Sequence, residues 1–132
     1  MSNKELIVHA YAELSTGNSR PLLELLADDV AWTVKGQTKW SGTYRGKQAV
    51  LRDLLGALGQ RLEGRYRATA ERVLADGDFV VAQAKAQATT KLGAAYDQEY
   101  CFVYRFEDGR IKEVTEYIDT ELVTSALGAI GS

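Results

Sequence analysis

Apolar and polar residues alternate through most of the second half of the chain. Such alternation over several residues is typical of a β-strand with one buried face. Turns rich in Asp and Gly at residues 76–78 and 107–109 separate neighbouring stretches, and turns of this kind favour antiparallel hairpins. The pattern therefore predicts four long strands, at residues 66–74, 79–90, 96–106 and 111–119.

In the first half, apolar residues recur every three or four positions, which is the period of an amphipathic helix. This pattern predicts helices at residues 4–15, 21–26 and 47–62, with a short strand at residues 30–34. Pro21 suits the first turn of the second helix, and Asp28 and Asp29 predict a turn after it. Helices followed by hairpins indicate the α+β class, with a curved sheet wrapped around helices on one side.

The stretch from Phe79 to Thr90 places small residues on one face of its strand. They are Val80, Ala82, Ala84, Ala86 and Ala88. A sheet face that packs flat on a helix is usually filled by Leu, Ile and Phe. We take the small residues to indicate vacant space, that is, a pocket. The alternative is a helix that approaches this strand very closely.

Composition limits the functional classes. The 132 residues suit one domain, so we expect residues 1–132 to form a single domain, with residues 121–132 as a last helical turn or a frayed end. A net charge of −2 without a basic stripe argues against a nucleic-acid partner. One Cys and one His cannot form a disulfide or a zinc pattern, and residues 1–16 do not read as a signal peptide or membrane segment. We expect a cytoplasmic protein without a metal site.

Four segments carry a family resemblance: IVHAYAELSTGN, LLADDVAWTV, WSGTYRGKQAV and FEDGRIKEVTEYID. Together they resemble the SnoaL-like proteins, which belong to the superfamily that shares the cone fold of nuclear transport factor and ketosteroid isomerase. The resemblance implies a cone-shaped α+β barrel, in which N-terminal helices pack against a curved mixed or antiparallel sheet that encloses a pocket. This cone carries isomerases, epoxide hydrolases, dehydratases, polyketide cyclases and proteins with no known reaction, so the chemistry depends on the pocket residues.

Glu116 is the leading catalytic candidate. Residue bulk and the resemblance together turn Val114, Glu116 and Ile118 of the last strand inward, so the acid lies among apolar and aromatic side chains. Loss of hydration raises the pKa of a carboxyl group and prepares it for acid–base work near neutral pH. The resemblance adds that limonene epoxide hydrolases have a carboxylate at the matching position and that SnoaL cyclases use a pocket carboxylate on the sheet.

The alternative for Glu116 is a solvated strand residue paired with a neighbouring cation. The cations available for such a pair are Lys112, Arg105 and Arg110.

Further candidates surround this acid. Tyr11 matches the tyrosine that donates a hydrogen bond to the substrate oxygen in ketosteroid isomerases, although a core tyrosine bound to a backbone carbonyl is the alternative. Trp32 and Val34 are candidates for a pocket wall, and Trp32 as core filler is the alternative. The remaining candidates for substrate binding are Ala84, Ala86, Tyr100, Phe102, Tyr104 and Ile118.

The sequence also departs from two of the family's reactions. The ketosteroid isomerase base would fall near Val34 and its protonated Asp near Phe102, and neither carboxylate is present. Epoxide hydrolases need an Arg and a second Asp where this chain has Ala84 and Ala86. We expect neither reaction by those residues.

The sequence therefore predicts a small-molecule enzyme that binds an apolar, cyclic substrate and transfers protons through Glu116 without a cofactor, as an isomerase, cyclase or dehydratase. The alternative is a non-catalytic module that binds hydrophobic ligands or dimerises. The outer sheet face is apolar enough to predict a homodimer through the sheets. It carries Val81, Gln83, Cys101, Val103, Thr115 and Tyr117.

Overall fold

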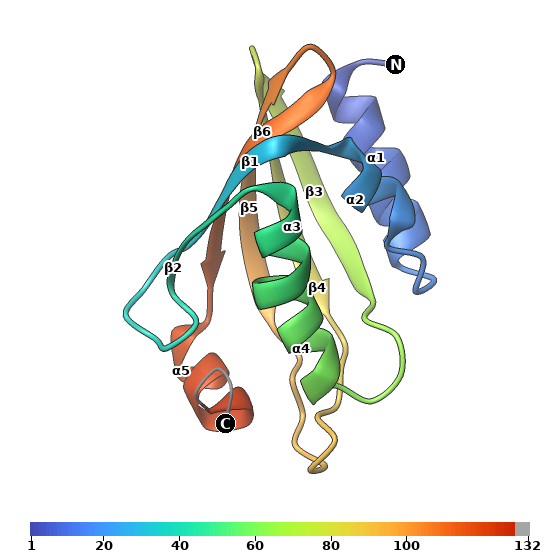
Figure 1. Ribbon diagram of the computed structural model, residues 1–132. Coiled ribbons are helices and arrows are strands. Elements are labelled where there is room, and N and C mark those ends of the chain that lie inside the picture. The colour runs from blue at the N-terminus through green and yellow to red at the C-terminus, as the bar shows by residue number, and fades with distance from the viewer. Residues whose placement is uncertain (129–132) are drawn as a thin grey trace.

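Six strands form one curved sheet at the centre of the molecule (Figure 1). The computed structural model describes residues 1–128. The strands are β1 Leu26–Val34, β2 Gly42–Arg45, β3 Ala68–Asp76, β4 Phe79–Ala86, β5 Glu99–Glu107 and β6 Arg110–Ile118. They lie in the order β2-β1-β6-β5-β4-β3, and every neighbouring pair is antiparallel except β1 with β6. The sheet is mixed and open, and the α+β class is confirmed.

Helices cover one side of this sheet. They are α1 Asn3–Leu14, α2 Arg20–Leu25, α3 Lys47–Ala49, the π-helical segment η1 Val50–Leu55, α4 Gly56–Arg61, α5 Thr120–Leu122 and a second π-helical segment, η2 Val123–Leu127. The elements α3, η1 and α4 follow one another as a single rod in front of the sheet, whereas α1 and α2 lie beside β3 (Figure 1). Within residues 1–128, no helix combines the length and the apolar character needed to cross a bilayer.

The start and packing of α1 follow from its sequence. Ser2 caps the helix, since its hydroxyl accepts from the backbone N–H of Glu5 and the Glu5 carboxylate accepts from the backbone N–H of Ser2, both at 3.1 Å. The apolar face of α1 is buried against β3 and β4. The predicted helix at residues 4–15 is confirmed to within one residue.

Strand β1 differs from the prediction, because it begins at Leu26 rather than at residue 30. The prediction of a turn at Asp28 and Asp29 was wrong. Leu26 already pairs with Ile111 of β6, and Asp29 binds the ammonium of Lys112 on the same strand at 2.6 and 2.7 Å. Residues 27–30, which include both aspartates, lie in the register shift between the pairs of Leu26 with Ile111 and of Ala31 with Glu113, so a bulge rather than a turn accommodates them.

Other parts of the sheet also differ from the prediction. Strand β2 was not predicted; it pairs with β1 and joins it through a 2.8 Å bond between the hydroxyls of Thr33 and Thr43. Strand β4 ends at Ala86 rather than at residue 90. The buried side chain of Gln98, just before β5, binds both backbone groups of Asp119 in place of ladder hydrogen bonds.

The segment after β6 packs back on the molecule as α5 and η2. Trp40 donates its indole N–H to the carbonyl of Gly128 at 3.0 Å, and Arg61 donates to the carbonyl of Leu127. The predicted tail thus begins as helical turns, and its residues 129–132 lie outside the described residues.

Candidate active site

A cavity of about 330 Å³ lies between the sheet and the helices that cover it. This volume is at the small end of the range for ligand pockets, about 300–1,000 Å³. Helices supply an aliphatic wall that includes Leu22, Leu23, Leu51, Leu54, Leu55 and Leu58. The aromatic and polar part of the lining consists of Tyr11 from α1, Tyr66 from the loop before β3, and Trp32, Tyr100, Phe102, Tyr104 and Glu116 from the sheet. The sheet therefore supplies the carboxyl group and most of the aromatic rings, and α1 adds the phenol of Tyr11.

The structure brings together six of the ten residues that the sequence proposed for the site. These are Tyr11, Trp32, Tyr100, Phe102, Tyr104 and Glu116. Four others do not line this cavity, namely Val34, Ala84, Ala86 and Ile118.

The row of alanines on β4 is buried, but it does not border the cavity. Ala82, Ala84 and Ala86 are at most 1 % exposed, and α1 packs against β3 and β4. The burial of the row therefore fits the alternative of a closely approaching helix.

Glu116 is held at the middle of the aromatic wall. It lies on β6 directly opposite Phe102 of β5, and the indole Nε1 of Trp32 on β1 donates to its Oε1 at 2.8 Å. The residue is only 9 % exposed. Burial raises the pKa of its carboxyl group to about 7, although the hydrogen bond from Trp32 opposes part of that rise.

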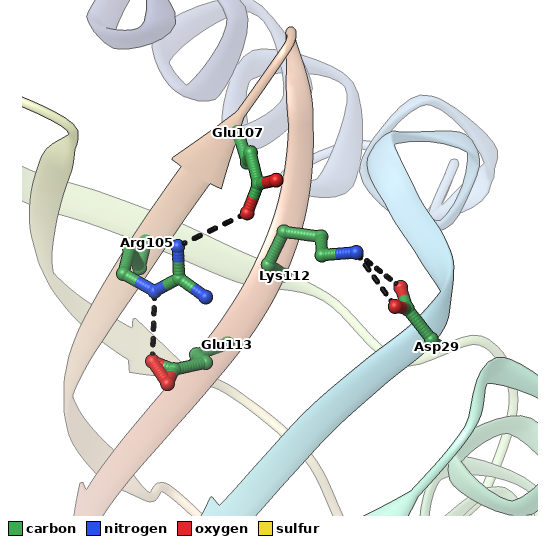
Figure 2. Close-up of polar contacts among 5 residues, drawn as sticks. All are labelled: Asp29, Arg105, Glu107, Lys112 and Glu113. Atoms are coloured by element: carbon green, nitrogen blue, oxygen red, sulfur yellow. Dashed lines mark hydrogen bonds and ion pairs between the residues drawn. The ribbon is translucent and has the colours of Figure 1, made fainter.

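The cations near Glu116 in the sequence are engaged elsewhere in the fold. Figure 2 shows Arg105 and Lys112 paired with acids other than Glu116. Arg105 binds Glu107 and Glu113, Lys112 binds Asp29, and Arg110 donates to the carbonyl of Glu24. The alternative of a solvated, ion-paired Glu116 therefore does not hold.

Two phenols form a close pair next to this acid. The hydroxyls of Tyr11 and Tyr104 are 2.6 Å apart, and both side chains are buried. Burial is the main reason that the pKa of each phenol rises well above its ordinary value, so both stay protonated at neutral pH. Tyr11 thus binds a second phenol rather than the backbone carbonyl considered in its core alternative.

Phe102 organises the rest of the aromatic wall. Its ring is stacked between those of Tyr100 and Tyr104, with centroids 4.7 and 5.8 Å away and interplanar angles of 20°. Trp32 meets Phe102 edge-on, at 6.1 Å and 82°. These contacts hold the rings in a stiff row that a flat ligand could lie against.

Sequence reasoning missed Tyr66 and the leucines of the rod formed by α3, η1 and α4. Tyr66 stands two residues before β3, between Arg65 and Arg67, and only its isolation between two charged residues hints at burial. The leucines were recognised as the apolar face of a helix. Four of them point at a cavity rather than at the sheet, which periodicity alone does not reveal.

The segment η1 shapes the aliphatic wall. Its π-helical turn is closed by a hydrogen bond from the Gly56 N–H to the Leu51 carbonyl. A Cβ atom at Gly56 would lie 2.7 Å from that carbonyl oxygen, so the close approach requires glycine. Both residues line the cavity.

The chemistry available in the cavity is limited. Its lining within residues 1–128 contains no Lys, Arg or His. The described part of the chain also contains no group of three His, Cys, Asp or Glu residues able to hold a metal ion. The arrangement offers one carboxyl group that titrates near neutral pH, several phenolic donors and an apolar bed.

Known proteins share this architecture. The model of the SnoaL-like domain matches residues 7–114. Among curated proteins, none matches the chain. An NTF2-like protein of unknown function from Burkholderia pseudomallei superposes with a TM-score of 0.80 at 21 % identity, with 100 % of both chains covered.

Two further solved structures carry functional names. A candidate SnoaL-like polyketide cyclase from Jannaschia superposes with a TM-score of 0.77 at 18 % identity, covering 96 % of this chain and 92 % of that one. A candidate isomerase from Rhodopseudomonas palustris gives 0.70 at 21 % identity, covering 97 % and 98 %. At these identities the likeness establishes the fold, and the cone architecture expected from the sequence is confirmed.

Proposed function

Because the chain belongs to the SnoaL-like domain family, we propose that it is an enzyme that transfers protons on an apolar, cyclic carbonyl or hydroxylated compound held in the cone cavity. One observation carries the proposal: Glu116 is buried and faces the cavity, and this burial raises the pKa of its carboxyl group to about 7. A general base works best when its pKa lies near the working pH.

The first step is removal of a proton from the carbon next to a carbonyl group. The carboxylate of Glu116 takes that proton, and the electron pair of the C–H bond moves to the carbonyl oxygen as an enolate. In the Tyr11 and Tyr104 pair only one O–H is used between the phenols, so the other can donate to the enolate oxygen. The carboxylic acid of Glu116 then returns the proton.

The fate of the enolate separates the reaction types. Return of the proton to a different carbon is isomerisation, and its transfer to a departing hydroxyl is dehydration. In cyclisation the enolate carbon attacks a second carbonyl carbon, and the oxygen of that carbonyl takes the proton from Glu116. The names of the Jannaschia and Rhodopseudomonas proteins, cyclase and isomerase, belong to reactions that can begin with this step.

Exchange of carbon-bound hydrogen tests the step without the natural substrate. β-Tetralone, a bicyclic ketone, is incubated in heavy water with the protein, and loss of its α-proton NMR signals is followed. We expect the wild type to accelerate the exchange and Glu116→Gln to lower that acceleration at least about 100-fold. Glu113→Gln is the matched control, since Glu113 lies on the same strand and is half-exposed outside the cavity. Equal acceleration by wild type and Glu116→Gln would remove Glu116 from the mechanism.

A second candidate function is ligand binding without turnover. It is favoured by one observation, that Glu116 is the single acid lining the cavity within residues 1–128. Binding of an apolar ligand together with no exchange above background in the wild type would support this function.

We further propose that the protein is a cytoplasmic homodimer joined through its outer sheet face. A row of uncharged residues crosses all six strands there, in the order Leu74, Val81, Val103, Thr115, Thr33 and Thr43. The charged residues nearest its centre, Arg105 and Glu113, form an ion pair. A second copy could therefore cover the row without burying an unpaired charge.

A further inference from the structure

The cavity contains a second pair of phenols that the proton-transfer step does not use. Tyr66 and Tyr100 both line it, each phenol affects the pKa of the other, and burial keeps both protonated at neutral pH. Apart from this mutual interaction, neither hydroxyl has a hydrogen-bond partner within residues 1–128. A pair of phenols can use only one of its two O–H donors internally, so at least one is left for a ligand.

The two phenol pairs stand on opposite sides of Glu116. Tyr100, Phe102 and Tyr104 are alternate residues of β5, and Glu116 is the cross-strand partner of the middle one. Tyr11 is hydrogen-bonded to Tyr104 at one end of this row, and Tyr66 interacts with Tyr100 at the other, while its phenol also interacts electrostatically with Tyr11. Donors for ligand oxygens are therefore available at both ends of the aromatic row, with the carboxyl group between them.

The charge of the ligand follows from the lining. A carboxylate or phosphate in this cavity would meet no Lys, Arg or His of residues 1–128, and it would face the carboxyl group of Glu116. Burial of an anion without a counter-charge is strongly unfavourable. The pocket therefore suits an uncharged compound.

We propose that Tyr66 and Tyr100 form a second oxygen-binding subsite, and that the ligand is an uncharged ring compound with an oxygen function toward each end. The inference rests on the proposed function only in placing the first oxygen at Tyr11 and Tyr104. The rings would lie between the leucines of the helical wall and the aromatic row.

Calorimetric binding of three matched probes tests the subsite. The probes are β-naphthol, the naphthalenediol with hydroxyls at opposite ends of its fused rings, and the hydroxynaphthoate in which a carboxylate replaces one of those hydroxyls. They are titrated into the wild type and into Tyr66→Phe/Tyr100→Phe, which removes both phenol oxygens but keeps both rings. Replacement of both partners by apolar groups of the same shape costs little stability. Tyr117→Phe, on the outer face, is the matched control.

We expect the wild type and Tyr117→Phe to bind the diol about 3- to 10-fold more tightly than β-naphthol, as one additional hydrogen bond allows. In the double variant the two affinities should become equal. The hydroxynaphthoate should bind the wild type at least about 10-fold more weakly than the diol does. If thermal unfolding shows the double variant to be unfolded, Tyr66→Phe alone should still reduce the preference for the diol.

Three results would overturn the inference: equal binding of diol and β-naphthol by the wild type, an unchanged preference in a folded double variant, or tight binding of the carboxylate. The binding experiment tests the subsite, whereas the hydrogen-exchange assay tests the proposed proton transfer, so failure of one can be told from failure of the other. A preference for the diol that depends on Tyr66 and Tyr100, together with exchange that does not depend on Glu116, would support the subsite and reject only the proton transfer.

Discussion

The indole N–H of Trp32 donates a 2.8 Å hydrogen bond to Glu116 across the parallel junction of β1 and β6. The bond favours the ionised carboxylate, and it opposes the burial that raises the pKa of the same group. Trp32→Phe keeps an aromatic ring in the wall but removes the donor. We expect the pKa of Glu116 to rise further above 7, by about one unit, because a hydrogen bond to a charged group contributes about 1.5–3 kcal/mol and only part of it is lost. Carbon-13 NMR titration of the glutamate side chains measures the change, and an unchanged or lower pKa would contradict this role of Trp32.

The raised pKa of Glu116 also makes stability depend on pH. Its folded value, about 7, exceeds the reference value of 4.5, so the folded state holds a proton that the unfolded state has released between these two values. The destabilisation is absent at pH below the reference value and grows to about 3 kcal/mol above the folded value. Glu116→Gln should therefore match the wild type in stability at about pH 4 and exceed it by up to about 3 kcal/mol at about pH 9.

Urea unfolding at both pH values measures this difference. Glu113→Gln serves again as the control, because Glu113 is half-exposed and paired with Arg105. A stability difference between Glu116→Gln and the wild type that does not change with pH would show that Glu116 is not the group responsible.

The pair formed by Tyr11 and Tyr104 predicts a graded loss of catalysis. Tyr11→Phe leaves the Tyr104 hydroxyl without its partner and free to donate, so exchange of β-tetralone should fall only about 10-fold. Tyr11→Phe/Tyr104→Phe removes both donors, and the loss should reach about 100- to 1,000-fold. NMR-detected exchange measures both variants. A full loss in the single variant would instead assign the oxyanion contact to Tyr11 alone.

Two glycines of the helical wall give opposite predictions. A Cβ at Gly56 would lie 2.7 Å from the Leu51 carbonyl oxygen, so Gly56→Ala must displace the π-helical turn and should destabilise the protein by about 1–3 kcal/mol. A Cβ at Gly59 meets nothing within 4 Å, and Gly59→Ala should stabilise the helix by about 0.5–1 kcal/mol. Thermal unfolding distinguishes the two, and equal effects would show that η1 can relax without cost.

The outer face of the sheet predicts the oligomeric state. Light scattering at micromolar concentration should give the mass of a dimer, and Val103→Lys should give a monomer, because Val103 is central in the uncharged row. Gln60→Lys places the same charge on α4, away from this face, and should remain dimeric. A wild-type monomer would reject the interface.

The sequence predicted best the helices and strands that have one buried face, because the spacing of their apolar residues follows that face. Alternation fixed the inward parity of Tyr100, Phe102 and Tyr104, and their burial follows it. Alternation shows which side chains of a strand are buried, but it does not show what packs against them. The alanines of β4 are the clearest case, because small volume is required equally beside an empty space and beneath a closely packed helix, and only the position of α1 separates the two.

Other features depended on partners far away in the chain. The bulge of β1 at Asp28 and Asp29 lies between the pairs that Leu26 and Ala31 make with β6, and no local pattern signals that pairing. Tyr66 lies outside any regular strand, so its approach to Tyr100 comes from the path of the loop before β3. The identity of Glu116 as the buried acid could be inferred from parity, but its hydrogen bond to Trp32 could not, since the two residues are 84 positions apart.

That separation has a consequence for biogenesis. During synthesis the indole emerges long before the acid it binds, and until the final strand docks in parallel beside the first, the carboxyl group is hydrated like that of any free glutamate. Its proton affinity therefore changes only when β6 docks beside β1. The ionisation of this one side chain thus reports completion of the fold.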